Sequence, residues 1–288
     1  MDQRIINLFD EYTHAPLSRK DFLDRLVKLT GGTALAAAAL AALEPGYAQA
    51  ATPGGTEKSK LVAEEVTWPG EAGVTMKGLL VHPKDKKKRG AVVVIHENRG
   101  LTPHIKDVTQ RVAQAGYLAL GVDALSVFGG TPANEDEGRT LIGKLDKPQN
   151  LNNYLAALRY LRARPESNGR TGCVGFCWGG AMANQLALHD PQLNAAVAYY
   201  GTQPEATADL THIKAHLMLH YAALDERVNA GKDAYEAALK AAGVPFEQFV
   251  YEGVNHAFNN DSSPARYNAE AAKLAWERTL RLFKKQLG

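Results

Sequence analysis

The sequence predicts an α/β fold in which a mostly parallel sheet is covered by helices on both faces. From Leu61 onward, apolar runs of strand length alternate with amphipathic segments of helix length, the pattern of successive β-α crossovers. The chain has 288 residues, 45% hydrophobic and 22% charged, which is enough for one substantial core and gives no compositional sign of disorder. We expect one globular domain at 51–288, preceded by a different kind of segment at 1–50.

The expected elements begin with two short strands at 62–67 and 74–81, which form an antiparallel pair because only a turn containing Pro and Gly separates them. A buried strand at 91–95 then opens the parallel part of the sheet, in which each further strand is reached by a crossover. The other expected elements are a helix at 105–115, a strand at 117–122, an irregular excursion at 128–147, a helix at 151–162, a strand at 171–176, a helix at 181–188, strands at 194–200 and 215–221, a helix at 230–242, a strand at 246–251 and a helix at 264–286.

Charge and cysteine content exclude several kinds of protein. The net charge of +2 is too small to indicate a nucleic-acid or membrane partner, and the basic run at 84–89 is expected in a solvated turn. Cys173 and Cys177 lie on one predicted strand and its end. Four residues of strand separate them by roughly 13 Å, beyond the limit of roughly 7 Å for a disulfide. Both are therefore expected to be free thiols.

The first fifty residues have the pattern of an export signal. A basic stretch with Arg19 and Lys20 is followed by a small-residue apolar run at 30–43 and by Ala-Gln-Ala at 48–50. The stretch at 18–23 resembles a twin-arginine signal with Lys20 in place of the second arginine, which predicts cleavage after Ala50 and a periplasmic protein. The apolar run is shorter than the roughly 20 residues of a membrane span. The alternative is a retained amphipathic N-terminal helix, and a cytoplasmic protein if the signal is not used.

The stretch at 175–180, Gly-Phe-Cys-Trp-Gly-Gly, lies where a predicted strand gives way to a helix. It has the Gly-x-nucleophile-x-Gly pattern of the α/β-hydrolase fold, with Cys177 in place of serine. Gly175 and Gly179 have no Cβ to clash where the backbone turns sharply, and the following helix favours the thiolate. The alternative for Cys177 is a buried free cysteine beside a Gly-rich turn. Cys173, within the buried strand, is expected to pack in the core.

Asp225 and His256, which lie further along the chain, complete a candidate triad. Asp225 follows the strand at 215–221, and His256 follows the strand at 246–251. In an α/β-hydrolase fold the order is nucleophile, acid, histidine, and the three residues meet at the carboxyl edge of the sheet. A thiol is mostly protonated near neutral pH, so an imidazole must take its proton and a carboxylate must orient the imidazole. The sequence therefore predicts a Cys177-His256-Asp225 triad.

Other titratable residues at strand ends are weaker candidates. Glu226 and Asp123 are the rival acids, one displaced by a single residue and the other on an earlier strand. His96 and His220 are expected to be packed or hydrogen-bonded rather than to act as bases. Four further histidines are expected at ordinary surface or core positions: His104, His189, His212 and His216.

The loop after the strand at 91–95 is the place of the second oxyanion donor in this fold. The backbone N–H groups of Trp178 and Asn98 are the expected donors. One alternative for Glu97 and Arg99 is a solvated pair, but a carboxylate at Glu97 would lie close to the nucleophile.

Taken together, the motifs at 94–100, 175–180, 224–225 and 256–258 resemble those of the dienelactone hydrolase family, and the resemblance extends over about 62–287. It implies a metal-free and cofactor-free enzyme that opens a small ester or lactone through an acyl-enzyme. It assigns Cys177, Asp225 and His256 to the triad and Glu97 to the glutamate that contacts the resting thiol. Family members carry a substrate-binding arginine four residues after the histidine, where this chain has Asn260, so the substrate lacks a carboxylate or binds it differently.

Two other classes of function remain open on the sequence. One is a cysteine amidase or amidotransferase, because other α/β proteins also place cysteine on such a turn. The other is a non-catalytic binding protein on a hydrolase fold. The expected partner is a small-molecule substrate, without nucleic acid or stable membrane insertion, in a monomer or small homo-oligomer.

Overall fold

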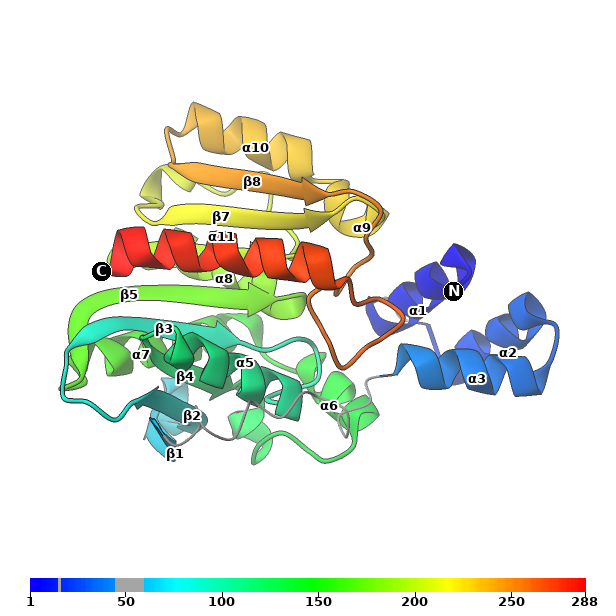
Figure 1. Ribbon diagram of the computed structural model, residues 1–288, viewed down its shortest axis with the longest axis horizontal. Coiled ribbons are helices and arrows are strands. Elements are labelled where there is room, and N and C mark those ends of the chain that lie inside the picture. The colour runs from blue at the N-terminus through cyan, green and yellow to red at the C-terminus, as the bar shows by residue number, and fades with distance from the viewer. Residues whose placement is uncertain (15–16, 45–59) are drawn as a thin grey trace.

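A twisted eight-stranded sheet forms the centre of the protein, whose computed structural model describes residues 1–14, 17–44 and 60–288 (Figure 1). The strands lie in the order β1-β2-β4-β3-β5-β6-β7-β8. Their bounds are β1 Leu61–Pro69, β2 Thr75–Pro83, β3 Arg89–Ile95, β4 Leu118–Asp123, β5 Ser167–Phe176, β6 Ala195–Tyr199, β7 His216–Ala222 and β8 Phe246–Tyr251.

The pairing of the strands sets the position of the site. β1 pairs with β2 and β2 with β4 in antiparallel fashion, and all the other neighbours are parallel. β3 lies between β4 and β5, so the chain moves to one side of β3 and then to the other. Ligands bind outside the carboxyl ends of strands at such a switch point. The expected antiparallel opening and parallel remainder are confirmed.

Helices cover both faces of the sheet, as the sequence predicts (Figure 1). One core contains side chains of α7 Lys147–Ala163, α8 Trp178–His189 and α10 Lys232–Ala241 packed on the sheet. The opposite core contains side chains of α5 Pro103–Gln114 and α11 Ala269–Leu287. Strands buried on both faces have continuous apolar sequences, which is why 91–95 is recognisable from the sequence alone.

Several predicted boundaries differ from the structure. The last helix begins at Ala269, not at 264, because the Asn268 side chain accepts a hydrogen bond from the backbone N–H of Ala271 and caps the helix there. The excursion at 128–147 contains α6 Glu135–Ile142. The helix predicted at 230–242 corresponds to α10, and the short helix α9 Glu226–Asn229 before it has no counterpart among the expected elements. Cys173 and Cys177 are both free, as expected.

Three helices form a lobe at the carboxyl ends of the strands (Figure 1): α1 Gln3–His14, α2 Arg19–Thr30 and α3 Thr33–Leu43. The lobe has its own small core, in which the Phe9 and Tyr12 rings of α1 pack on Phe22 of α2. Ser18 caps α2 through its side chain, and Gly31 ends that helix with a φ of 79°. At the end of α3, the Leu43 carbonyl accepts a hydrogen bond from Ser263.

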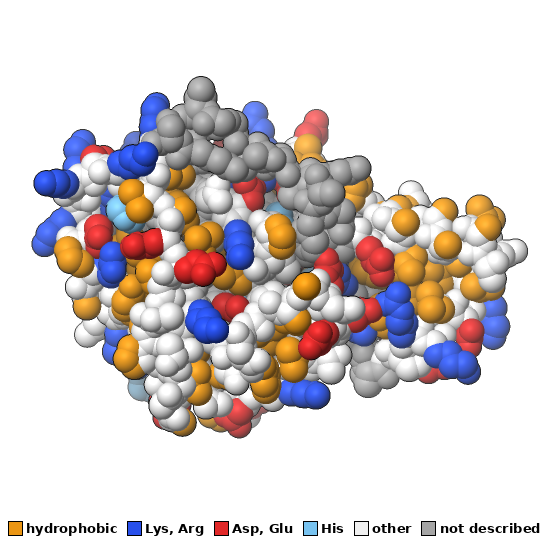
Figure 2. All heavy atoms as spheres, turned by 90° about the horizontal axis from the view of Figure 1, so that it is seen from below, with side chains coloured by type: hydrophobic (Ala, Val, Ile, Leu, Met, Phe, Trp, Pro, Cys, Tyr) orange, Lys and Arg blue, Asp and Glu red, His pale blue; other side chains and the backbone are white. Residues whose placement is uncertain are grey.

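The predicted export segment coincides with most of this lobe. Arg19 and Lys20 begin α2, and α3 holds the small-residue apolar run, most of which is exposed, as is visible at the right of Figure 2. Within the described ranges, no single helix is long and apolar enough to cross a membrane, and α2 and α3, which would be so together, are bent by 113° at their break. The predicted cleavage site at 48–50 lies outside the described residues. Cleavage and periplasmic location therefore stay predictions.

Candidate active site

Cys177 occupies the sharp turn between β5 and α8. Its backbone has a φ of 56° and a ψ of −115°, a strained conformation for a residue with a side chain, and the residue is 6% exposed. A Cβ on Gly175 would lie 1.9 Å from the carbonyl oxygen of Gly179, and one on Gly179 would lie 2.5 Å from that of His96. Only glycine fits at both positions, so the motif read from the sequence forms the tight turn expected of it.

The predicted acid and histidine form a hydrogen-bonded pair next to this turn. His256 Nδ1 donates to Asp225 Oδ2 at 2.6 Å, and both side chains are almost completely buried. Asp225 follows β7 and also caps α9, because its Oδ1 accepts from the backbone N–H of Val228 at 3.2 Å. The loop after β8 delivers His256. These two residues thus meet at the edge of the sheet that the chain order indicates.

The sulfur of Cys177 lies close to His256 but is not bonded to it. A ring nitrogen of His256 is within 4.8 Å of Sγ, and Nε2 of His256 is buried without a hydrogen-bond partner in the described part of the chain. The structure therefore brings the three predicted residues together while leaving the link between sulfur and His256 open.

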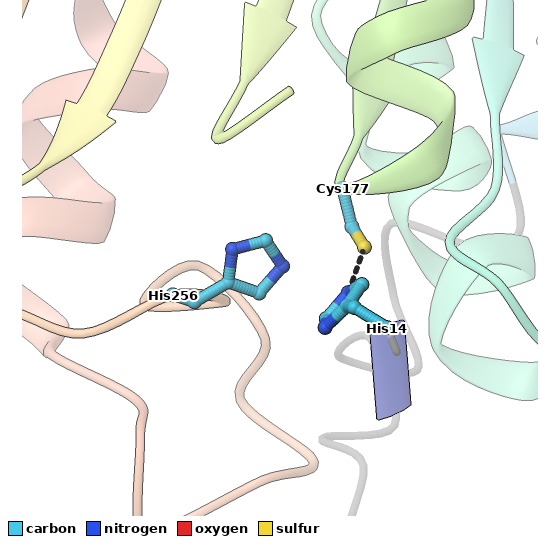
Figure 3. Close-up of side chains that lie close together, drawn as sticks. All are labelled: His14, Cys177 and His256. Carbon is cyan, nitrogen blue, oxygen red and sulfur yellow. Dashed lines mark hydrogen bonds between the residues drawn. The ribbon is translucent and has the colours of Figure 1, made fainter. Parts of the chain in front are cut away.

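A histidine that the sequence analysis did not consider contacts the sulfur instead. His14, the last residue of α1, places Nε2 3.0 Å from Sγ of Cys177 (Figure 3). Its Nδ1 donates to the backbone carbonyl of Asp10 at 2.9 Å and lies 3.0 Å from Oδ1 of the same residue. The export pattern at 1–50 predicts a segment that is removed, so the sequence predicts no residue of this segment at the site. The only local signal is the i, i+4 spacing of Asp10 and His14 on one amphipathic helix.

The charges of the site favour an ionised His14. Burial by itself would lower the pKa of His14, but the charge of Cys177 and the contact with Asp10 outweigh burial and raise it. Burial would likewise raise the pKa of Asp10, yet His256, His14 and Arg227 together hold it far below its usual range. Arg227 Nε donates to Asp10 Oδ2 at 3.2 Å. Arg227, Asp10 and His14 therefore lead to Cys177 in a series in which cations and anions alternate when Cys177 is a thiolate.

The loop after β3 makes contacts that differ from one expectation. Arg99 forms an ion pair with Glu135, so the structure does not support the alternative of a solvated pair of Glu97 and Arg99. Glu97 Oε2 instead accepts from Asn260 Nδ2 at 2.7 Å. Asn98 donates from its side chain to the backbone carbonyl of Thr13 at 2.9 Å. The predicted oxyanion donors, the backbone N–H groups of Asn98 and Trp178, stay predictions.

The alternative acids and histidines either make structural hydrogen bonds or are exposed. Asp123 accepts from the backbone N–H groups of Leu125 at 3.0 Å and Thr131 at 2.8 Å, while Glu226 is exposed. His220 is buried between the Tyr251 hydroxyl at 2.9 Å and the Thr279 hydroxyl at 3.2 Å, and burial lowers its pKa to about 3. His96 is also buried and accepts from the backbone N–H of Ala124 at 3.2 Å. The expectation that both histidines are packed is confirmed.

Cys177 opens onto a cavity of about 290 Å³ whose wall includes His14, Trp178, Tyr200 and His256. This cavity shares several lining residues with a neighbouring cleft of about 1000 Å³: Ile142, Gly143, Trp178, Ala181 and Thr202. A second, narrow recess at the sulfur, with room for about 20 Å³, is lined by Glu97, Asn260 and Arg266 among others. A small molecule can therefore reach the sulfur with α1 in place.

The side chains of His14, Cys177 and His256 are of the types that a zinc ion prefers. One atom each of His14, Cys177 and His256 lies within 4.8 Å of the other two. Two imidazoles and a thiolate are common zinc ligands. Each imidazole also has a carboxylate behind it, Asp10 for His14 and Asp225 for His256, the arrangement that orients metal-binding histidines.

The parallel sheet with covering helices, the cysteine on a tight strand-to-helix turn, and the acid and histidine after β7 and β8 define an α/β-hydrolase. The model of the "Dienelactone hydrolase family" matches residues 76–287, and the chain belongs to that family. The resemblance seen in the sequence motifs is thereby confirmed.

Individual relatives agree with this assignment. A predicted carboxymethylenebutenolidase of Escherichia coli O157:H7 is 33% identical over 224 residues, which are 72% of this chain and 82% of that protein. A second, from Methylorubrum extorquens, is 30% identical over 85% of this chain and 88% of its own length. The crystal structure of a predicted dienelactone hydrolase from Klebsiella pneumoniae superposes with a TM-score of 0.70 at 30% identity, covering 78% of this chain and 98% of that one.

Proposed function

We propose that this enzyme hydrolyses small esters or lactones through a covalent intermediate on Cys177, with His256 and Asp225 as its proton-transfer pair. The observation that carries the proposal is the position of Cys177, on a turn that only its flanking glycines permit, facing a cavity next to a buried His256–Asp225 pair. A nucleophile, a base and a group that orients the base are the parts that acyl transfer needs.

In the first half of the reaction, the Cys177 thiol passes its proton to Nε2 of His256, and the resulting thiolate attacks the carbonyl carbon. A C–S bond forms, and the carbonyl electron pair moves to oxygen, where the backbone N–H groups of Trp178 and Asn98 stabilise it. The C–O bond to the leaving group then breaks, and the departing alkoxide or enolate takes a proton from His256. In a lactone the leaving oxygen stays tethered to the acyl group.

In the second half, water hydrolyses the thioester. His256 takes a proton from the water, hydroxide adds to the carbonyl carbon, and the C–S bond breaks to return the thiolate and release the carboxylic acid. Asp225 holds the proton on Nδ1 of His256, so that Nε2 is available for each transfer.

The cavity and its charges bear on the substrate. A volume of about 290 Å³ fits a small acyl group. Asn260, at the position where relatives carry a substrate-binding arginine, is a neutral side chain already bonded to Glu97. We therefore expect that neutral short-chain esters and lactones are accepted and that a substrate carboxylate is not required.

The test is hydrolysis of short-chain aryl esters and of lactones with and without a carboxylate by the full-length protein. Cys177→Ala should lower turnover by about 10³-fold or more. Cys173→Ala is the matched control, because Cys173 is a second buried cysteine on β5, in the core rather than facing the cavity. It should retain activity. Turnover preserved in Cys177→Ala, or amide hydrolysis without ester hydrolysis, would refute the proposal.

A further inference from the structure

The contact between α1 and the nucleophile gives the site a second base. We propose that His14, held by Asp10, is a catalytic residue that takes the proton of the Cys177 thiol in place of His256 and returns it to the leaving group, while His256 and Asp225 serve the water. This inference rests on the proposed function, because it takes Cys177 as the nucleophile.

The hydrogen bonds of His14 fix which nitrogen can act. Nδ1 lies 2.9 Å from the carbonyl oxygen of Asp10 and 3.0 Å from its carboxylate, so the proton of the neutral ring is on Nδ1. Nε2 then has a free lone pair 3.0 Å from Sγ. The thiol proton moves to Nε2 and its bonding electron pair stays on sulfur. The product is an imidazolium between a carboxylate and a thiolate, a pairing in which each charge stabilises the next.

His256 approaches the sulfur from another side. The two imidazole rings are 4.7 Å apart between centroids and inclined by 73°, and Figure 3 shows His14 below the sulfur of Cys177 and His256, on its loop, to the left of both. Nε2 of His256 has no partner among the described residues, whereas Nε2 of His14 is bonded to the sulfur. A base that is not bonded to the thiol is available to the attacking water.

The loops that carry the other catalytic candidates also hold α1 in place. Asn98, next to Glu97, donates to the carbonyl of Thr13 at 2.9 Å. Asn255, next to His256, accepts from Gln3 at 2.5 Å. Arg227, two residues after Asp225, donates to Asp10 at 3.2 Å. Residues close in sequence to Glu97, His256 and Asp225 thus bind α1, and these contacts fix the position of His14 relative to the site.

A helix over an active site can also block it, and the cavity argues against that. With α1 in place, the space of about 290 Å³ still touches Cys177, His14 and His256 together. The helix therefore forms one wall of the substrate cavity. A chain cleaved after Ala50 would lose this wall and His14 with it, so the proposal assigns full activity to the uncleaved chain.

The test measures the reactivity of Cys177 towards iodoacetamide as a function of pH, together with ester turnover, in full-length variants. His14→Ala should slow alkylation by about tenfold or more near neutral pH and approach the wild-type rate in alkaline solution, where the thiol ionises without help. Turnover should fall by about 10²-fold. Asp10→Asn should shift both in the same direction by less, and Asn7→Ala, on the exposed side of α1, should shift neither.

Each outcome separates the two proposals. Wild-type alkylation and turnover in His14→Ala, with Cys177→Ala inactive, would overturn the role of His14 and leave the proposed function standing. Faster turnover in His14→Ala would also overturn it, because His14 would then be blocking the nucleophile. Should His14→Ala fail to fold, Asp10→Asn decides, since its pH profile must shift without loss of the folded state. Activity retained in Cys177→Ala would remove the proposed function itself.

Discussion

His256 and Asp225 share a short, buried hydrogen bond, 2.6 Å from Nδ1 to Oδ2. The bond places the ring proton on Nδ1 and leaves Nε2 unprotonated in the neutral imidazole. In the proposed mechanism, the carboxylate also stabilises the imidazolium that forms during each proton transfer. The pair acts as one unit, and its two members are held by loops that follow adjacent strands, β7 and β8.

Asp225→Asn should therefore abolish most activity without unfolding the protein. The amide would present a donor to Nδ1 and select the wrong tautomer, which lowers kcat by about 10³- to 10⁴-fold in such units. The amide oxygen can still cap α9 by accepting from Val228. Steady-state turnover is the measurement, and Glu226→Gln, one residue away and exposed, is the control. Equal activity in the two variants would exclude Asp225 as the residue that orients His256.

The turn at Cys177 should be intolerant of any added side chain. Gly175→Ala puts a Cβ 1.9 Å from the carbonyl oxygen of Gly179. We expect a loss of about 4 kcal/mol or more in unfolding free energy, because the backbone segments at Gly175 and Gly179 are both buried and cannot move apart freely to make room for the Cβ. The control is Gly143→Ala, since Gly143 has a helical φ of −65° and its nearest neighbour lies 3.5 Å away.

Urea denaturation measures both variants. Gly143→Ala should change the unfolding free energy by less than about 1 kcal/mol. A Gly175→Ala protein as stable as Gly143→Ala would show that the turn is looser than the structure has it.

Acid should destabilise the protein through His220. Its pKa is lowered by burial from 6.5 to about 3. Between these values the unfolded chain binds a proton at this residue and the folded chain does not, so unfolding free energy falls as the pH falls, by at most about 1.4 kcal/mol per pH unit. Above the pKa of the unfolded state, His220 is neutral in both states and the protein loses no stability through it. Below the pKa of the folded state, the loss is complete.

The measurement is unfolding free energy between about pH 6.5 and pH 5, above the range in which carboxylates titrate. His220→Gln should give a shallower gradient than the wild type even if it is less stable throughout. Part of the gradient should remain, because burial also lowers the pKa of His96. Parallel curves for the two proteins would rule out His220 as a source of acid sensitivity.

Zinc should inhibit the enzyme by binding the nucleophile. His14, Cys177 and His256 supply two imidazoles and a thiolate within 4.8 Å of one another. We expect inhibition by zinc ions that a chelator reverses and that magnesium, which prefers oxygen ligands, does not reproduce. The measurement is the concentration of zinc that halves the alkylation rate of Cys177. His14→Ala should raise that concentration by about tenfold or more, and an unchanged value would show that α1 contributes no ligand.

Much of the fold is predictable because its signals are local. The strand at 91–95 is apolar throughout because β3 is buried on both faces, and the glycines around Cys177 report a backbone turn that other residues cannot make. Asp225 and His256 follow from chain order, because the carboxyl ends of parallel strands share one edge of the sheet.

Two features of the site are not predictable from the sequence because they depend on contacts between distant parts of the chain. His14 meets Cys177 across 163 positions, and Arg99 meets Glu135 across 36. Neither contact leaves a periodicity or a motif. The predicted start of the last helix at 264 is wrong for a different reason, since the Asn268 side chain caps α11 and the helix begins only after it.

The most direct test of the account is to trap the acyl-enzyme. The full-length protein is mixed with a slowly hydrolysed aryl ester, quenched in acid at successive times, and examined by intact-mass and peptide mass spectrometry. We predict one acyl group per chain, on the peptide that contains Cys177, forming and decaying at rates that match turnover. Turnover without an acyl group on Cys177, or with the acyl group on another residue, would contradict the central claim.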